Sequence, residues 1–227
     1  MPLSPGVHPL GPTLPVHVFQ AEQPGPTAII QAGIHGDEVA GVHALAELLE
    51  EGPRPIRGRL LIIPVMNPAA YRARQRAAPG GLDLNRCFPG DPAAPEPERR
   101  RAAQLMALMR DERPALVATL HESTKRYDPA VSPSFGQTIV YGVQPMPGIV
   151  QEVIDHMNAH LEHEEERWAH QYFPVATSST EVIVDALGCV GLCVETWMGF
   201  DERRRIAMQR RVVERLLEGV GTGLAVD

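Results

Sequence analysis

An apolar run, TAIIQA at residues 27–32, leads directly into the glycine-rich segment GIHGDE at residues 33–38. A buried strand that ends in a glycine-rich turn and continues as a helix is typical of α/β folds, and functional groups gather at such turns. His35 and Glu38 are three positions apart, so a tight turn or a first helical turn directs both side chains the same way. One imidazole and one carboxylate that converge are half of a typical zinc site. The other half must come from elsewhere in the chain.

The rest of the sequence alternates between strand-like and helix-like segments. Apolar or alternating runs predict strands at residues 14–20, 27–33, 59–66, 115–120, 137–141 and 190–195. Helical periodicity predicts helices at residues 37–51, 96–110, 148–168 and 201–217, with a short helix or turn at 180–187. This alternation predicts a three-layer α/β/α sandwich around a mostly parallel mixed sheet. We expect one domain over residues 1–227, in which residues 1–12 form a loose lead-in.

Composition and charge argue against several classes of function. The formal net charge of −7 argues against nucleic-acid binding, which requires a basic surface. No apolar run approaches the roughly 20 residues of a membrane-spanning helix, and segment 1–15 lacks the pattern of a secretory signal. Three cysteines, an odd number in a long chain, indicate reduced thiols. We therefore expect a cytoplasmic protein without a nucleic-acid or membrane partner.

Polar residues follow several of the predicted strands. His121 comes directly after the strand at 115–120, and Glu195 ends a late apolar run. The segment DLNR at residues 83–86 lies in a long irregular stretch, 68–95, and a loop of that length is usually functional or mobile. Because the carboxyl ends of parallel strands share one edge of a sheet, these groups are expected to converge on the glycine-rich turn.

The order of these elements resembles that of a known superfamily. A turn with the spacing H-x-x-E, a later D-L-N-R, a strand-terminal histidine and a late strand-terminal glutamate resemble the zinc carboxypeptidases. The forms G-x-H-G-D-E and D-L-N-R-x-F-P-G are most similar to its succinylglutamate desuccinylase/aspartoacylase branch. The resemblance spans roughly residues 27 to 200, and it implies a zinc carboxypeptidase-like fold.

The resemblance also implies a metal centre. His35, Glu38 and His121 would hold one Zn²⁺ ion per chain. Two imidazoles and one carboxylate leave a fourth position for water, which is the arrangement of a catalytic zinc. Glu195 would act as the general base, taking a proton from the attacking water and delivering it to the leaving amine.

Substrate-binding residues follow from the same resemblance. Asn85 and Arg86 would bind a substrate carboxylate, since a planar guanidinium suits a carboxylate bidentately. Asp83 would be structural and hold the loop that presents Arg86. Tyr172 lies 23 positions before Glu195, and it matches a mobile tyrosine of the superfamily's carboxypeptidases.

Three assignments stay open at this point. Arg76 is expected to polarise the scissile carbonyl, with Arg72 and Arg74 competing for that role. Glu122, next to the strand-terminal histidine, either orients a metal ligand or points to solvent. Asp37 is expected to be a helix N-cap or a first-turn acid.

The implied activity is that of a zinc-dependent hydrolase that cleaves an amide bond next to a free carboxylate. The residues of the two motifs favour an N-acyl amino acid deacylase of the desuccinylase/aspartoacylase type. Only 32 residues follow Glu195, so we expect an open pocket without the extra C-terminal domain of aspartoacylases. An open pocket favours the alternative, a small carboxypeptidase or cell-wall peptide amidase.

A non-catalytic binding module is a third hypothesis. The presence of all three expected metal ligands and of Glu195 argues against it. The expected partner is thus a small molecule or short peptide with a free carboxylate; the sequence does not indicate an oligomeric state.

Overall fold

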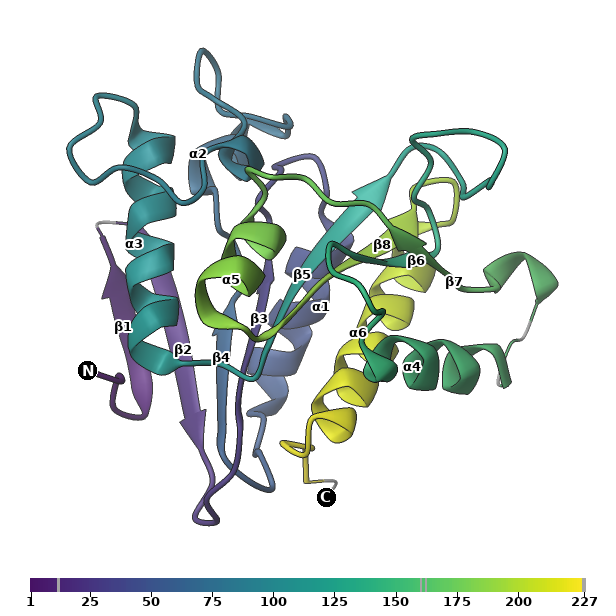
Figure 1. The fold of residues 1–227 in the computed structure, drawn as a ribbon, viewed down its shortest axis with the longest axis horizontal. Coiled ribbons are helices and arrows are strands. Elements are labelled where there is room, and N and C mark those ends of the chain that lie inside the picture. Colours follow the sequence, from purple (N-terminus) through teal and green to yellow (C-terminus); the bar gives the residue numbers. More distant parts are fainter. Residues whose placement is uncertain (12, 160, 162, 226–227) are drawn as a thin grey trace.

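The computed structural model describes residues 1–227 except positions 12, 160, 162 and 226–227. Within the described part, eight strands form one sheet in the order β1-β2-β4-β3-β5-β8-β6-β7 (Figure 1). The strands are β1 (Gly6–Leu10), β2 (Leu14–Gln20), β3 (Thr27–Ala32), β4 (Arg59–Ile63), β5 (Leu116–Ser123), β6 (Thr138–Tyr141), β7 (Ala169–Tyr172) and β8 (Val190–Trp197).

The middle of the sheet is parallel and its outer strands are mixed. β3 runs parallel to β4 and β5, and β5 runs parallel to β8. β1, β2 and β4 pair antiparallel on one side, whereas β6 is antiparallel to β8 and parallel to β7 on the other. The predicted mixed sheet with a parallel centre is therefore confirmed.

Helices cover both faces of the sheet, which gives the predicted three layers (Figure 1). The helices are α1 (Ala40–Glu51), α2 (Pro68–Ala73), α3 (Pro97–Glu112), α4 (Gly148–Ala159), α5 (Ser179–Leu187) and α6 (Glu202–Gly219), with 3₁₀ turns at Leu84–Arg86 and Glu164–Glu166. One apolar cluster packs α1, α4 and α6 on one face, and the other packs α3 and α5 on the opposite face. Successive β3 residues serve the two clusters in turn, Ala28 and Ile30 facing the first and Ile29 the second.

The structure corrects two predictions about secondary structure. The lead-in contains an edge strand, β1, which pairs with β2. The helix predicted at 148–168 ends at Ala159, and the chain turns back to form β7; positions 160 and 162 of that prediction lie outside the described residues. Asn158 accounts for the return, because its side chain accepts a hydrogen bond from the Trp168 amide and donates one to the Trp168 carbonyl. Such a contact carries no periodic signal in the sequence.

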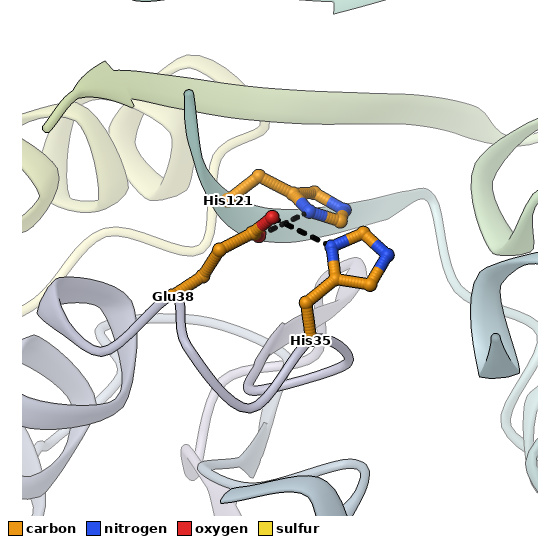
Figure 2. A group of neighbouring side chains, drawn as sticks. All are labelled: His35, Glu38 and His121. Carbon is orange, nitrogen blue, oxygen red and sulfur yellow. Dashed lines mark hydrogen bonds and ion pairs between the residues drawn. The ribbon is translucent and has the colours of Figure 1, made fainter. Parts of the chain in front are cut away.

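The parallel centre of the sheet brings the chemically interesting segments to one edge. The glycine-rich turn follows β3, and it lies beside the end of β5 (Figure 2). β5 and β8 pair so that His121 is directly opposite Glu195. None of the helices in the described part of the chain is long and apolar enough to cross a membrane.

Candidate metal centre and its cavity

Three buried side chains converge where β3 and β5 end. One ligand atom from each of His35, Glu38 and His121 lies within 4.8 Å of the other two. Nδ1 of His35 is 2.7 Å from one carboxylate oxygen of Glu38, and Nδ1 of His121 is 2.8 Å from the other (Figure 2). The sequence-predicted ligand set is thus brought together, with both imidazoles presenting the same ring nitrogen to one carboxylate.

The backbone around these three side chains is held by long-range hydrogen bonds. The amide of Glu122 donates to Oε2 of Glu38 at 3.2 Å, and the side chain of Gln209 donates to the carbonyl oxygen of His121 at 2.8 Å. Nε2 of His35 lies 3.3 Å from a carboxylate oxygen of Asp83. A carboxylate on the outer nitrogen of an imidazole orients the ring and raises the basicity of its inner nitrogen.

The cluster has the electrostatics of a site for a cation. Burial works against ionisation of Glu38, yet His35 and His121 bring its pKa down to about 2. Burial likewise opposes protonation of both histidines, but the charge of Glu38 raises the pKa of His35 and, more strongly, that of His121. Positive charge is therefore stabilised between the three groups. Two imidazoles and one carboxylate that favour positive charge between them fit a divalent metal ion such as Zn²⁺.

Glu195 lies beside the cluster and lines the same cavity. Burial raises the pKa of its carboxyl group to about 7; the charge of Glu38 adds to this, and the charges of His121, His35 and Arg76 oppose it. A carboxyl group with a pKa near neutral is suited to accept and then return a proton.

Of the three competing arginines, Arg76 is the one that lines the cavity. Its guanidinium bonds to Asp83 at 3.0 Å and reaches to 3.8 Å from Glu38. Arg72 and Arg74 are exposed and do not line the cavity, and Arg74 stacks over the ring of Tyr71. Arg76 is thus the one of the three arginines at the cavity, and its role in polarising the carbonyl stays a prediction.

The DLNR segment forms a 3₁₀ turn beside the cavity. Asp83 caps this turn through its carboxylate, which accepts from the amide of Asn85 at 2.9 Å. Oδ1 of Asn85 accepts from the amide of Ser179 at 3.0 Å, which ties the turn to the start of α5. Arg86 is exposed, lines the cavity, and donates to the carbonyl oxygen of Asn85.

Glu122 and Asp37 do not follow their simplest interpretations. Glu122 is 4% exposed, so the alternative that it points to solvent is wrong. It forms an ion pair with Arg205 on α6, and it accepts a hydrogen bond from the amide of Ala40. Asp37 is exposed and lies ahead of Val39, the N-cap of α1, so the predicted capping role of Asp37 is wrong. The first free amide of α1 is capped instead by Glu122.

Tyr172 is placed away from the cluster. It is 46% exposed on β7, packs against the ring of Tyr141, and is not among the residues that line the cavity. Its neighbour Phe173 lines the cavity instead. The predicted substrate contact of Tyr172 has no counterpart in this arrangement.

The cavity that contains the cluster has a volume of about 370 Å³, which is within the range of small-molecule sites. Several residues that line the cavity were not predicted from the sequence to do so: Phe135, Val140, Phe173, Thr180 and Glu181. They come from β6, from α5 and from irregular segments far apart in the chain. The pattern S-x-x-E at residues 178–181 is a detectable signal there, although it predicts a helix start rather than a site.

Residues 24–126 match the family model for the succinylglutamate desuccinylase/aspartoacylase catalytic domain. The chain is 43% identical over 81 residues to an N-alpha-acetyl-L-2,4-diaminobutyric acid deacetylase of Halomonas elongata, covering 35% of this chain and 23% of that protein. It is 42% identical over 86 residues to a succinylglutamate desuccinylase of Burkholderia thailandensis, covering 36% and 24%. These matches confirm the predicted resemblance. The matched segments span about a quarter of the length of these relatives.

Solved structures confirm the fold. The product-bound cell shape determinant protein Csd4 from Helicobacter pylori superposes with a TM-score of 0.85 at 18% identity, covering 95% of this chain and 57% of that one. A succinylglutamate desuccinylase from Silicibacter sp. TM1040 superposes with a TM-score of 0.71 at 23% identity, covering 94% and 62%. The region matched by the family model contains His35, Glu38 and His121, whereas Glu195 lies beyond it.

Proposed function

We propose that this chain, which carries a match to the succinylglutamate desuccinylase/aspartoacylase catalytic domain, is a zinc-dependent hydrolase of amide bonds next to a free carboxylate. The observation that carries the proposal is the meeting of two Nδ1 atoms, from His35 and His121, on the carboxylate of Glu38. Glu195 stands next to this group in the neighbouring strand. We further propose that residues 1–227 act as a single catalytic domain.

In this proposal, Nδ1 of His35, Nδ1 of His121 and the carboxylate of Glu38 would hold one zinc ion. The buried positions of all three and the stabilised positive charge between them support this assignment. When bound, zinc supplies Lewis acidity toward the scissile carbonyl and toward the attacking water.

The remaining steps fall to side chains around the cavity. Glu195 accepts a proton from the attacking water and returns it to the nitrogen of the leaving amine. Arg76 donates to the carbonyl oxygen as negative charge develops there, and Asp83 holds the guanidinium in position. Arg86 binds the free carboxylate of the substrate from the 3₁₀ turn that Asn85 fixes to α5.

The preferred substrate class is an N-acyl amino acid. This choice is supported by the sequence identity to two relatives. One is named as a deacetylase of N-alpha-acetyl-L-2,4-diaminobutyric acid, and the other is named as a succinylglutamate desuccinylase. A short peptide is the second candidate, because the solved structures of similar fold include Csd4 bound to a tripeptide. Phe135 and Phe173 give the cavity aromatic side chains against which the apolar part of either substrate class could pack.

The cellular location also belongs to the proposal. Cys87, Cys189 and Cys193 are all free thiols in the structure. Three free thiols fit a reducing compartment, so we propose a cytoplasmic enzyme.

The deciding experiment combines metal analysis with hydrolysis assays. We expect about one zinc per chain by elemental analysis, turnover of N-acyl amino acids or dipeptides, loss of turnover on chelation, and its return with zinc. His35→Asn should lose both zinc and turnover, whereas His163→Asn, at an exposed position far along the sequence, should keep both. Turnover that survives complete chelation would end the zinc proposal. Zinc binding without turnover of either substrate class would favour the non-catalytic binding module.

A further inference from the structure

Glu181 is an acidic side chain in the cavity that the proposed reaction does not use. It lies in the first turn of α5 and lines the same cavity as His121 and Glu195. Its Oε2 atom is shielded from solvent and has no hydrogen-bond partner in the described part of the chain. A shielded carboxylate oxygen without a partner is costly, so a native site that keeps one calls for an explanation.

Helix capping does not explain this carboxylate. Ser178 and Glu181 have the spacing of a capping box, and the first half of the box is present, because Oγ of Ser178 accepts from the amide of Glu181 at 3.2 Å. In the second half, the glutamate side chain would accept from the amide of Ser178. That amide donates instead to the carbonyl oxygen of Val175 at 2.8 Å. The carboxylate of Glu181 is therefore left for another partner.

No cation of the protein neutralises Glu181 either. Among the described residues, none of the ion pairs within 4.0 Å involves this side chain. The carboxylate lies close to the backbone at Gly142, directly after β6, because a Cβ added there would be 3.4 Å from Oε2. Oε2 thus lies toward Gly142, whereas Oε1 is not shielded in this way and also has no hydrogen-bond partner among the described residues, so it is the atom that a ligand in the cavity can reach.

A basic residue of the same cavity also lacks an acidic partner among the described residues. Arg86 lines the same cavity, and its guanidinium bonds to no carboxylate among the described residues. A hydrogen bond connects the segments that carry Arg86 and Glu181. Oδ1 of Asn85, in the 3₁₀ turn of Arg86, accepts it from the amide of Ser179 on α5.

Asp37 is exposed at this cavity and Glu195 is used by the proposed reaction, which leaves Glu181 as the carboxylate without a role. A cavity that offers the guanidinium of Arg86 and the carboxylate of Glu181 is complementary to a ligand that carries a carboxylate and a separate cation.

We propose that Glu181 binds a cationic group on the side chain of the substrate amino acid, so the preferred substrates are acyl or peptidyl derivatives of basic amino acids. This inference rests on the proposed function for the reaction itself. A side-chain ammonium next to Glu181 would form a charge-assisted hydrogen bond and satisfy the carboxylate. A neutral side chain of the same length leaves the carboxylate unsatisfied, and an acidic side chain is repelled.

The test measures binding first and turnover second, on the zinc-loaded protein. Calorimetry gives the dissociation constants of Nα-acetyl-lysine, of its neutral isostere Nα-acetyl-norleucine, and of Nα-acetyl-glutamate. We expect the lysine derivative to bind about tenfold or more tightly than the norleucine derivative, since hydrogen bonds to charged groups contribute at least that much. The glutamate derivative should bind weakest of the three.

Two variants identify the residue responsible. Glu181→Gln keeps the shape of the side chain and should bring the lysine-to-norleucine ratio close to one, without weakening the binding of norleucine. Asp185→Asn removes a charge from the exposed face of the same helix and should leave the ratio unchanged. The ratios of kcat/KM for the same derivatives should follow the binding ratios.

The outcomes separate the two proposals. A preference for lysine that survives in Glu181→Gln, or that is absent from the parent protein, overturns the role of Glu181. A preference that depends on Glu181, in a protein that hydrolyses none of the derivatives, supports the cation site and overturns the deacylase assignment instead.

Discussion

The amide of Ala40 donates a hydrogen bond to Oε2 of Glu122 at 2.9 Å, across 82 positions of sequence. The other carboxylate oxygen of Glu122 pairs with Arg205 on α6. One buried side chain thus joins the start of α1, the end of β5 and a helix near the C-terminus. It does so directly beside His121, so the position of this candidate metal ligand depends on contacts distant in sequence.

Replacement of Glu122 should therefore cost stability. Removing one partner of a buried ion pair costs about 3–5 kcal/mol, and the lost helix cap adds about 1 kcal/mol, so Glu122→Ala should be severely destabilised. Glu122→Gln keeps an oxygen that can accept from Ala40 and should lose less. Urea unfolding measures both, with Glu47→Ala on the exposed face of α1 as a control that should change by less than about 0.5 kcal/mol. Equal stabilities of Glu122→Ala and the control would show that the buried contacts contribute nothing.

Metal binding should release protons. The pKa values of His35 and His121 are raised above their ordinary value of 6.5, chiefly because Glu38 outweighs the effect of burial. The stabilisation that these protonated histidines give the metal-free protein is complete below pH 6.5 and is lost as pH rises through the folded-state pKa values. Zinc needs neutral imidazoles, so its apparent affinity should rise with pH in the same range.

Calorimetry in two buffers of different ionisation enthalpy would count the released protons. The observed binding enthalpy at pH 7 should change with the buffer, and the change should be smaller in His121→Gln. An enthalpy that is independent of the buffer would mean that the two imidazoles are already neutral in the metal-free protein.

The fold and the metal cluster could be predicted because their signals are local. The H-x-x-E spacing places His35 and Glu38 together within one turn, and the ends of parallel strands place His121 near them. The other parts of the site depend on contacts without a periodic pattern. Arg76 could not be distinguished from Arg72 and Arg74, because the sequence at 68–95 has no periodicity from which the direction of a side chain could be predicted, although the structure forms α2 within it.

The roles of Glu122 and Glu181 were hidden for a related reason. Each is a glutamate at an ordinary local position, one near the end of a strand and one in the pattern of a capping box. Their importance comes from partners such as Ala40 and Arg205, or from the absence of a partner within the described residues. Burial and pairing across long sequence separations are properties of the folded chain.

Glu195→Gln should separate metal binding from turnover. The change keeps the shape of the side chain but removes a carboxyl group whose pKa burial raises to about 7. Loss of a general base typically lowers the rate about 10²–10⁴-fold, so kcat should fall by that factor while zinc content stays at the level of the parent. Elemental analysis and steady-state kinetics on the same preparation check both. A variant with parental kcat would remove Glu195 from the proton transfer.

Arg86→Ala should weaken the binding of substrates that carry a free carboxylate. Because the guanidinium lines the cavity, its loss should raise KM by about 10- to 100-fold, the range expected for a charged hydrogen-bonded contact. Arg72→Ala, at an exposed arginine outside the cavity lining, is the matched control. Substrates with the carboxylate replaced by a carboxamide should show no difference between parent and Arg86→Ala. If KM for the free acid is unchanged, another group binds the carboxylate.

Gly36→Ala should damage the metal cluster without touching a ligand. A Cβ at Gly36 would lie 2.0 Å from the carbonyl carbon of Ala70 and 2.1 Å from its oxygen, and these are backbone atoms of α2 that cannot move aside cheaply. The amide of Gly36 also donates to the carbonyl oxygen of Gln75, so the turn is held against this segment from two directions. The added methyl group must push the turn away from α2, and His35 moves with it.

We expect Gly36→Ala to lower zinc affinity by at least about tenfold, since disturbed support of ligands typically costs 10- to 100-fold, and to lower the unfolding midpoint in urea. Gly148→Ala is the control: a Cβ there meets nothing within 4 Å, and Gly148 begins α4, so its stability should stay equal or rise by about 0.4–1 kcal/mol. Competition with a chromogenic zinc chelator measures the affinities. Parental zinc affinity in Gly36→Ala would mean that the turn has room to adjust, and that the close approach to Ala70 does not position His35.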